Sequence, residues 1–163
     1  IQAEIMELLL LLCEKHNVGL ILITHDLGVV SQVTQRTLVM YAGRVIEQGP
    51  TREIINDAQH PYTQGLINAL PQMATPGSRL NQIRGSMPTL TKIPAGCAFN
   101  PRCDFAANIC LEKVPAFAHS GNCKVACHMV DAMVAGERWT PIITDANGNG
   151  STPTDSHRTE VNA

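Results

Sequence analysis

His25 is the first residue whose type and position could do chemistry. It follows the apolar run GLILIT of residues 19–24 and precedes Asp26, which can cap a helix that continues to about residue 35. In an α/β sheet, ligands gather beyond the carboxyl ends of the strands, and an imidazole N–H placed there could donate a hydrogen bond to an anionic oxygen. Position alone, however, favours the simpler role of a histidine that helps to start the helix.

A second candidate site lies in residues 97–127, which hold five of the six cysteines. Gaps of five, six and sixteen residues separate Cys97, Cys103, Cys110 and Cys127, and Cys123 lies within the last gap. The remaining Cys13 belongs to a leucine-rich segment and is expected to be a small core residue. Such a density of thiols is not that of an ordinary cytosolic protein.

The spacing alone leaves four explanations of these cysteines open. Disulfides need an oxidising compartment, and no export signal is visible. Structural zinc accepts thiolates and histidines such as His119 or His128, but its ligands usually stand two to four residues apart. An iron–sulfur cluster takes four thiolates from loops, which suits longer and irregular gaps. Unligated buried thiols are the fourth explanation, although this segment offers few apolar residues for a core.

The elements that must position both sites have the pattern of an α/β fold. Residues 1–16 are strong helix formers, and residues 18–24 read as a continuous apolar strand of the kind found in a parallel sheet covered on both faces. Residues 37–49 alternate around an Ala-Gly pair, which predicts a hairpin. Two further short helices are predicted to begin at Pro50 and Pro61.

Composition divides the chain and limits its partners. Residues 1–71 carry the α/β pattern, residues 72–96 are a linker or arm, residues 97–128 are the cysteine segment, and residues 129–163 are a polar, largely disordered tail. Twelve basic and fourteen acidic residues give a net charge of −2 without a basic block, which argues against nucleic acid as a partner. The longest apolar run, residues 8–13, is far short of the ~18 residues of a membrane span.

The context of His25 resembles a known family. Residues 19–49, GLILITHDLGVVSQVTQRTLVMYAGRVIEQG, are similar to the histidine-loop region of ATP-binding cassette (ABC) proteins, in which an apolar strand leads to T-H-D, a helix and a V-M-Y-x-G hairpin. The preceding IQAEIMELLLLL resembles the helix after the Walker B and D-loop segments. The resemblance covers residues 1–57 and implies that His25 is the switch histidine that contacts the γ-phosphate of ATP bound with Mg²⁺.

The same resemblance sets a limit on what this chain does alone. The Walker A glycine loop, the glutamine loop, the signature motif and the Walker B carboxylates are missing from the sequence. Backbone amides of a glycine-rich loop do most of the phosphate holding in such sites. We therefore expect this chain alone neither to bind nor to hydrolyse ATP, whereas the full-length parent does both.

Two further stretches narrow the family to the ATPase subunits of oligopeptide and dipeptide importers. QHPYTQGLINALP, residues 59–71, resembles the His-Pro-Tyr element that follows the cassette in these subunits. Helix initiation by Pro61, with packing by Tyr62 and Leu66, explains the same residues without any mechanistic role.

The second stretch comprises GCAFNPRCDFAANIC and KVACH, which resemble the C-terminal segment of the same subunits. That segment is associated with a 4Fe–4S cluster in some members. The resemblance implies the ligands Cys97, Cys103, Cys110 and Cys127, with zinc as the alternative metal, and leaves Cys123 as a spare thiol or a rival for the fourth place. Arg102 is expected to offer a cation near an anionic cluster.

Together these resemblances imply the C-terminal part of a P-loop NTPase (ABC cassette) domain with a loop-rich, cysteine-containing extension. The sequence opens on Ile1 inside a helical pattern, so we expect a piece of a longer protein. The whole would be a transport ATPase at the cytoplasmic face of the cell membrane, with permease subunits and a second cassette as partners. Two other functions remain open: a metal-stabilised interaction module without nucleotide chemistry, and a free-standing zinc regulator.

Overall fold

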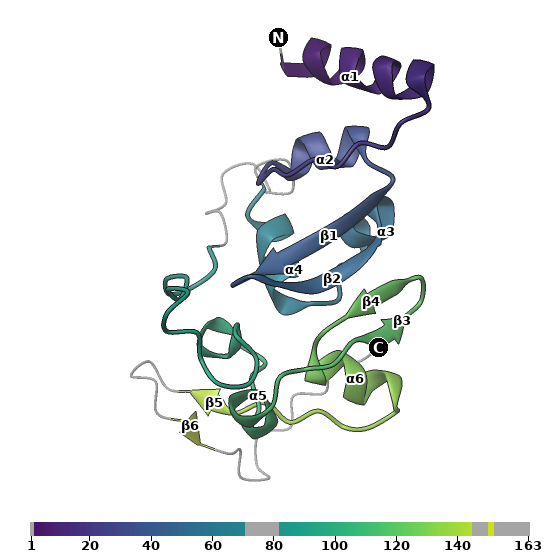
Figure 1. Ribbon diagram of the computed structural model, residues 1–163. Coiled ribbons are helices and arrows are strands. Elements are labelled where there is room, and N and C mark those ends of the chain that lie inside the picture. The colour runs from purple at the N-terminus through teal and green to yellow at the C-terminus, as the bar shows by residue number, and fades with distance from the viewer. Residues whose placement is uncertain (1, 71–81, 145–149, 152–163) are drawn as a thin grey trace, which may run out of the picture.

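The computed structural model describes residues 2–70, 82–144 and 150–151, and it has a mixed α/β fold (Figure 1). Four strands form an antiparallel sheet in the order β1-β2-β4-β3, and β5 pairs separately with β6. The elements are α1 (Gln2–His16), α2 (Leu27–Val33), β1 (Arg36–Tyr41), β2 (Arg44–Pro50), α3 (Thr51–Asn56), α4 (Pro61–Asn68), the 3-10 turn η2 (Asn100–Arg102), α5 (Asn108–Glu112), β3 (Ala118–Ser120), β4 (Cys123–Val125), α6 (His128–Val134), β5 (Ile143–Thr144) and β6 (Gly150–Ser151).

The N-terminal helix forms as predicted but stands apart from the rest of the molecule (Figure 1). It ends where Asn17 takes a left-handed conformation with φ 50°, as asparagine often does after a helix. Leu8 and Leu11 are more than half exposed on its surface. The helix is therefore formed by its own residue propensities rather than by packing in this structure.

Residues 18–24 do not form the predicted buried strand. The side chains of Ile21 and Ile23 are 89% and 94% exposed. A parallel strand needs neighbours for its N–H and C=O groups and layers on both faces for its side chains. None of the described strands pairs with this segment. The prediction is wrong for this chain, because the partners that a central strand requires are not beside it.

The predicted hairpin is confirmed as β1 and β2. Its turn consists of Ala42 and Gly43, with φ of 46° and 78°, and two successive positive φ values are the geometry that tight hairpins prefer. Alternate residues of β1, including Val39 and Tyr41, are buried. The opposite face of β1 is exposed, so β1 contributes only one of its faces to the core.

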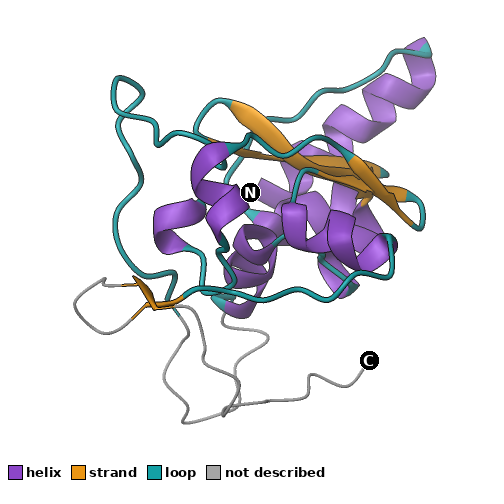
Figure 2. Cartoon of the chain, turned by 90° about the horizontal axis from the view of Figure 1, so that it is seen from below, coloured by secondary structure: helices purple, strands orange, loops and turns teal. Residues whose placement is uncertain are grey.

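The cysteine segment extends the sheet of this hairpin. Strand β4 pairs with β2 at Glu47–Val125 and Gln48–Lys124, and the Ala126 amide donates to the Ile46 carbonyl at 2.8 Å. Most helices gather on one side of the sheet (Figure 2). The hairpin, α3, the cysteine segment and α6 therefore share one core, made of Val39, Tyr41, Ala42, Ile46, Ile54, Phe99, Cys123, Val125, Cys127 and Val130.

The remaining helices begin where the sequence predicts. Helices α3 and α4 start directly after Pro50 and at Pro61, and α2 follows Asp26. Residues 82–96, in the predicted linker, contain no helix or strand, whereas residues 72–81 of it lie outside the described residues. Helix α6 and strands β5 and β6 fall within residues 129–163, and the rest of that predicted tail, residues 145–149 and 152–163, is likewise outside them.

Candidate functional site

The backbone around His25 is held by two local hydrogen-bond motifs. The Asp26 amide donates to Thr24 Oγ1 at 3.0 Å. Asp26 Oδ1 in turn accepts from the amides of Gly28 at 2.9 Å and Val29 at 3.3 Å, which confirms the predicted helix cap. The His25 side chain itself is exposed. Its ring is therefore presented to solvent from a backbone that is fixed on its C-terminal side.

Four of the six cysteines lie around one small cavity. Its volume is about 10 Å³, which is room for about one water molecule. Histidine, aromatic and apolar side chains complete the wall. The cavity is lined by Cys97, Cys103, Cys110 and Cys127 together with His60, Pro61, Phe99, Asn100, Phe105, His128, Met129 and Trp139.

The predicted iron–sulfur or zinc centre is contradicted. Within the described ranges, no group of three or more His, Cys, Asp or Glu side chains is arranged to hold a metal ion. Burial raises the pKa of Cys103 to about 12 and that of Cys127 to about 11, and it also raises the pKa of Cys97 and Cys110. The four thiols are therefore neutral side chains in the wall of this cavity.

The sequence argument for a metal was that residues 97–128 could not bury enough apolar surface to order themselves. The structure shows why that argument failed. Phe99, Cys123 and Val125 are each buried to 3% exposure or less in the core that they share with the hairpin. The cysteine segment is therefore ordered by packing on β1 and β2 rather than by an ion.

Cys123 does not line the cavity and occupies a separate position on β4. Its thiol lies 3.8 Å from the carboxylate of Glu53, which also accepts a hydrogen bond from Asn122 Nδ2 at 2.7 Å. A Cβ added to Gly49 would meet Cys123 Sγ at 2.4 Å. Cys123 is a free thiol that packs between β4, β2 and α3.

His60, the histidine of the His-Pro-Tyr element, caps its own helix. Its Nδ1 accepts a hydrogen bond from the Tyr62 amide at 3.0 Å, so Nε2 carries the proton in the neutral ring. The ring is 1% exposed, and Nε2 has no hydrogen-bond partner among the described residues. Burial lowers the pKa of His60 to about 4, which keeps the ring neutral at physiological pH.

A buried carboxylate holds the same element on the hairpin. Glu47 of β2 is fully buried, and its two oxygens accept from the amides of Gln59 at 2.7 Å and His60 at 3.2 Å. Burial raises the pKa of Glu47, and the Thr63 hydroxyl together with these two amides opposes the rise. Tyr62, next to His60, stacks edge-on against Tyr41 at 4.7 Å between ring centroids. The element is thus fixed to the sheet by both polar and aromatic contacts.

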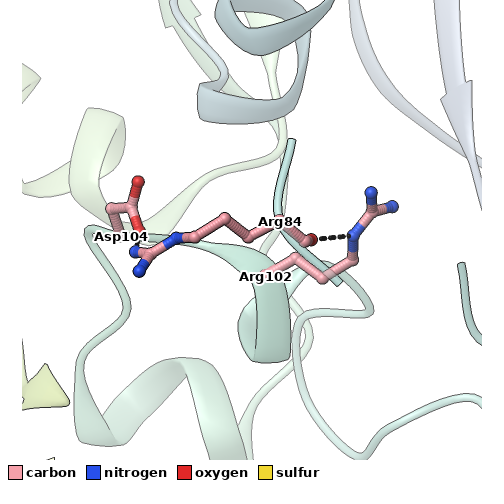
Figure 3. A network of polar contacts seen from close by, with 3 residues as sticks. All are labelled: Arg84, Arg102 and Asp104. Atoms are coloured by element: carbon pink, nitrogen blue, oxygen red, sulfur yellow. Dashed lines mark hydrogen bonds and ion pairs between the residues drawn. The ribbon is translucent and has the colours of Figure 1, made fainter. Parts of the chain in front are cut away.

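Arg102 fastens the segment that leads into the cysteines rather than facing an anionic cluster. Its guanidinium donates to the carbonyls of Arg84 at 2.7 Å and Ile83 at 3.3 Å and to the Tyr41 hydroxyl at 3.3 Å. Figure 3 shows the bond to the Arg84 carbonyl and the Arg84 side chain extended to Asp104, with which it forms an ion pair. Arg102 was expected to lie beside an anionic cluster, but it holds the backbone of residues 83–84 instead.

Sequence reasoning missed Glu47 as an anchor and His60 as a cavity residue. The signal for His60 was present, because a histidine directly before Pro61 occupies the helix-cap position. No comparable local signal marked Glu47, which stands between Ile46 and Gln48 in a strand that is buried on both sides at that point.

Comparison with known proteins agrees with these motifs. Residues 46–110 match the family model described as oligopeptide/dipeptide transporter, C-terminal region. The dipeptide transport ATP-binding protein DppD of Haemophilus influenzae is 46% identical over 128 residues, which are 78% of this chain and 39% of the relative. The oligopeptide transport ATP-binding protein AppD of Bacillus subtilis is 40% identical over 132 residues, which are 80% of this chain and 40% of the relative.

A third relative gives the same result. The oligopeptide transport ATP-binding protein OppD of Salmonella typhimurium is 43% identical over 127 residues, which are 78% of this chain and 38% of the relative. All three are ATP-binding proteins of transporters, as the T-H-D loop and the hairpin predicted. This chain belongs to the oligopeptide/dipeptide transporter family of ABC importer ATP-binding subunits. It spans about two fifths of the length of these relatives.

Proposed function

We propose that this chain is the part of an importer ATPase subunit that carries the switch histidine and the C-terminal extension. His25 would donate an imidazole N–H to the γ-phosphate of MgATP and so report whether that phosphate is present. The observation that carries the proposal is an exposed imidazole directly before a capped helix, in a chain that is 46% identical over 128 residues to a transport ATP-binding protein.

The rest of the nucleotide site would be supplied by segments with a phosphate-binding loop and acidic Mg²⁺ ligands, which this sequence does not contain. ATP hydrolysis in the whole subunit would drive the import of di- or oligopeptides through permease subunits, with a second cassette completing the assembly. The subunit would be peripheral at the cytoplasmic face of the membrane. No helix in the described part of this chain has the length and apolar character to cross a bilayer.

The exposure of residues 18–24 is a second observation that supports this function. An apolar segment exposed on both faces is the expected state of a central strand from which neighbouring strands and covering helices have been taken away. In the complete subunit this strand would deliver His25 to the edge of the sheet where the nucleotide binds.

The proposal is tested by substituting His25 in the full-length subunit with its transport partners. His25→Ala should lower the kcat of ATP hydrolysis by ~100-fold, the magnitude typical of the loss of one preorganised donor, with a small effect on ATP binding. His16→Ala, which removes an exposed histidine at the end of α1, is the matched control and should hydrolyse ATP as the unmodified subunit does.

If His25→Ala retained full ATPase activity, the switch role would be refuted. The competing function is an interaction module without nucleotide chemistry. In that case ATP would leave the loop around His25 unprotected in the full-length protein.

A further inference from the structure

Three threonine hydroxyls, two of them on buried residues, join the end of α2 to β1 and α3. Thr51 Oγ1 lies 2.9 Å from Thr34 Oγ1 and 2.8 Å from Thr37 Oγ1, and Thr34 Oγ1 donates to the Val30 carbonyl of α2 at 2.8 Å. Thr37 and Thr51 are buried. We call Thr34, Thr37 and Thr51 the threonine joint.

The protons of the joint have one consistent order. Each hydroxyl has a single proton to donate, and that of Thr34 goes to the Val30 carbonyl. Thr51 therefore donates to Thr34, and Thr37 donates to Thr51. Thr51 stands in the middle and takes part in both bonds. Its amide also donates to the Gln35 carbonyl at 3.0 Å. Thr51 therefore binds the segment between α2 and β1 through both its side chain and its backbone.

The other end of α2 is the site of His25. Asp26 caps the helix through the amides of Gly28 and Val29, so the backbone of His25 follows the direction of α2. With a rise of 1.5 Å per residue, Leu27 at the start of α2 lies ~10 Å along the axis from the joint at Thr34, and His25 stands two residues beyond it. A tilt of ~5° at the joint would displace the histidine by ~1 Å, and a misplacement of that size can cost ~100-fold in rate.

We propose that Thr51 is a positioning residue for the ATPase reaction: by fixing the end of α2, it sets where the His25 imidazole meets the γ-phosphate. This inference rests on the proposed role of His25. It also connects the C-terminal extension to the position of His25, because α3 continues from Thr51 to the loop that Glu47 anchors.

The test is a set of variants of the full-length subunit, assayed for ATP hydrolysis. Thr51→Val keeps the shape and removes the hydroxyl, and it should lower kcat about tenfold with the KM for ATP changed less than twofold. Thr51→Ser restores the hydroxyl and should recover most of the activity. Thr89→Val is the control, because it removes a threonine hydroxyl whose hydrogen bond, to Thr91, involves neither α2 nor the threonine joint.

A double variant separates positioning from general damage to the fold. In a His25→Ala background, Thr51→Val should cause no further loss of kcat, because it acts through a side chain that is already gone. Equal losses in both backgrounds, or an unchanged kcat for Thr51→Val alone, would overturn the inference. Should Thr51→Val fail to fold, Thr37→Val, which leaves the Thr51–Thr34 bond intact, should show the same non-additivity at a smaller amplitude, and additive losses would count against the joint.

Failure of the two proposals would look different. Full activity of His25→Ala alone would refute the switch role itself. Loss of activity in His25→Ala together with unchanged activity in Thr51→Val would refute only the positioning role.

Discussion

At the scale of single residues, the His-Pro-Tyr element owes its stability to a histidine that must stay neutral. His60 is buried, its Nδ1 caps α4, and its pKa is lowered to about 4. An ordinary histidine in the unfolded chain titrates near 6.5. Protonating the His60 ring in the folded chain therefore costs roughly 3 kcal/mol more than protonating it in the unfolded chain. The neutral His60 ring thus stabilises the fold of this element, and we call this contribution the His60 lock.

The sign of the resulting pH dependence follows from the lowered pKa. The contribution of His60 to the free energy of unfolding is complete above about pH 6.5 and is lost as the pH falls through about 4. His60→Asn should keep a cap, since asparagine is a favoured cap residue, but should remove this dependence. Denaturant unfolding at several pH values should show a stability difference between the parent chain and the variant that shrinks by roughly 3 kcal/mol from pH 7 to pH 4.

The control for this experiment is His119→Asn, at an exposed histidine of β3. This variant should keep the pH dependence of the parent. A stability difference between the parent and His60→Asn that stays constant over the whole pH range would contradict the lock.

Gly49 is required by its neighbour rather than by its backbone conformation. A Cβ there would stand 2.4 Å from Cys123 Sγ and 3.2 Å from the Cys123 Cα, so β4 would have to move away from β2. Gly49→Ala should lower the free energy of unfolding by about 2 kcal/mol, a typical cost of overpacking. Gly19→Ala, with nothing within 4 Å of the added carbon, is the matched control. Equal stability of the two variants in urea would show that β2 and β4 are not packed as described.

At the scale of elements, the sequence predicted correctly those helices and turns that are determined by residues close together in the chain. Asp26 caps α2, the Ala42–Gly43 turn closes the hairpin, and Pro61 opens α4, because in each case the residues that determine the structure lie within a few positions of one another. Residues 18–24 were predicted as a strand because their composition suits one. A strand forms only when neighbouring strands accept its hydrogen bonds, and the composition of one segment does not show whether such neighbours are present.

The cysteine segment shows the same division. The sequence indicated that Cys97, Cys103, Cys110 and Cys127 belong together, and they do line one cavity. It gave no sign that the three-residue strand β4 would add to the hairpin, since so short a stretch has almost no pattern. Because that pairing and the shared core order the segment, the metal inferred from its weak apolar content was the wrong explanation.

Hydrogen exchange tests this view of the elements. In this chain alone, the amides of residues 19–24 should exchange nearly as fast as an unfolded peptide, because they pair with no described strand. The Ala126 amide, bonded to the Ile46 carbonyl, should exchange as slowly as the amides between β1 and β2. In the full-length subunit the first segment should become protected while the second stays as it is. Fast exchange at Ala126 would show that the cysteine segment is not part of the sheet.

At the scale of the whole molecule, the chain consists of a well-packed body and a less covered N-terminal part. The hairpin, α3, α4 and residues 97–134 form the body around Tyr41, Phe99 and Val125. Helix α1 and residues 18–24 expose apolar side chains beyond it. The proposed switch histidine stands between the two parts, directly before the capped helix α2, whose far end the threonine joint ties to the body.

The most direct test of the central claim asks whether the loop around His25 senses the terminal phosphate. Hydrogen exchange of residues 24–30 would be measured in the full-length subunit with Mg²⁺ and either ADP or a non-hydrolysable ATP analogue. The account predicts slower exchange with the triphosphate than with the diphosphate, and no such difference in His25→Ala. Identical exchange with both nucleotides would contradict it.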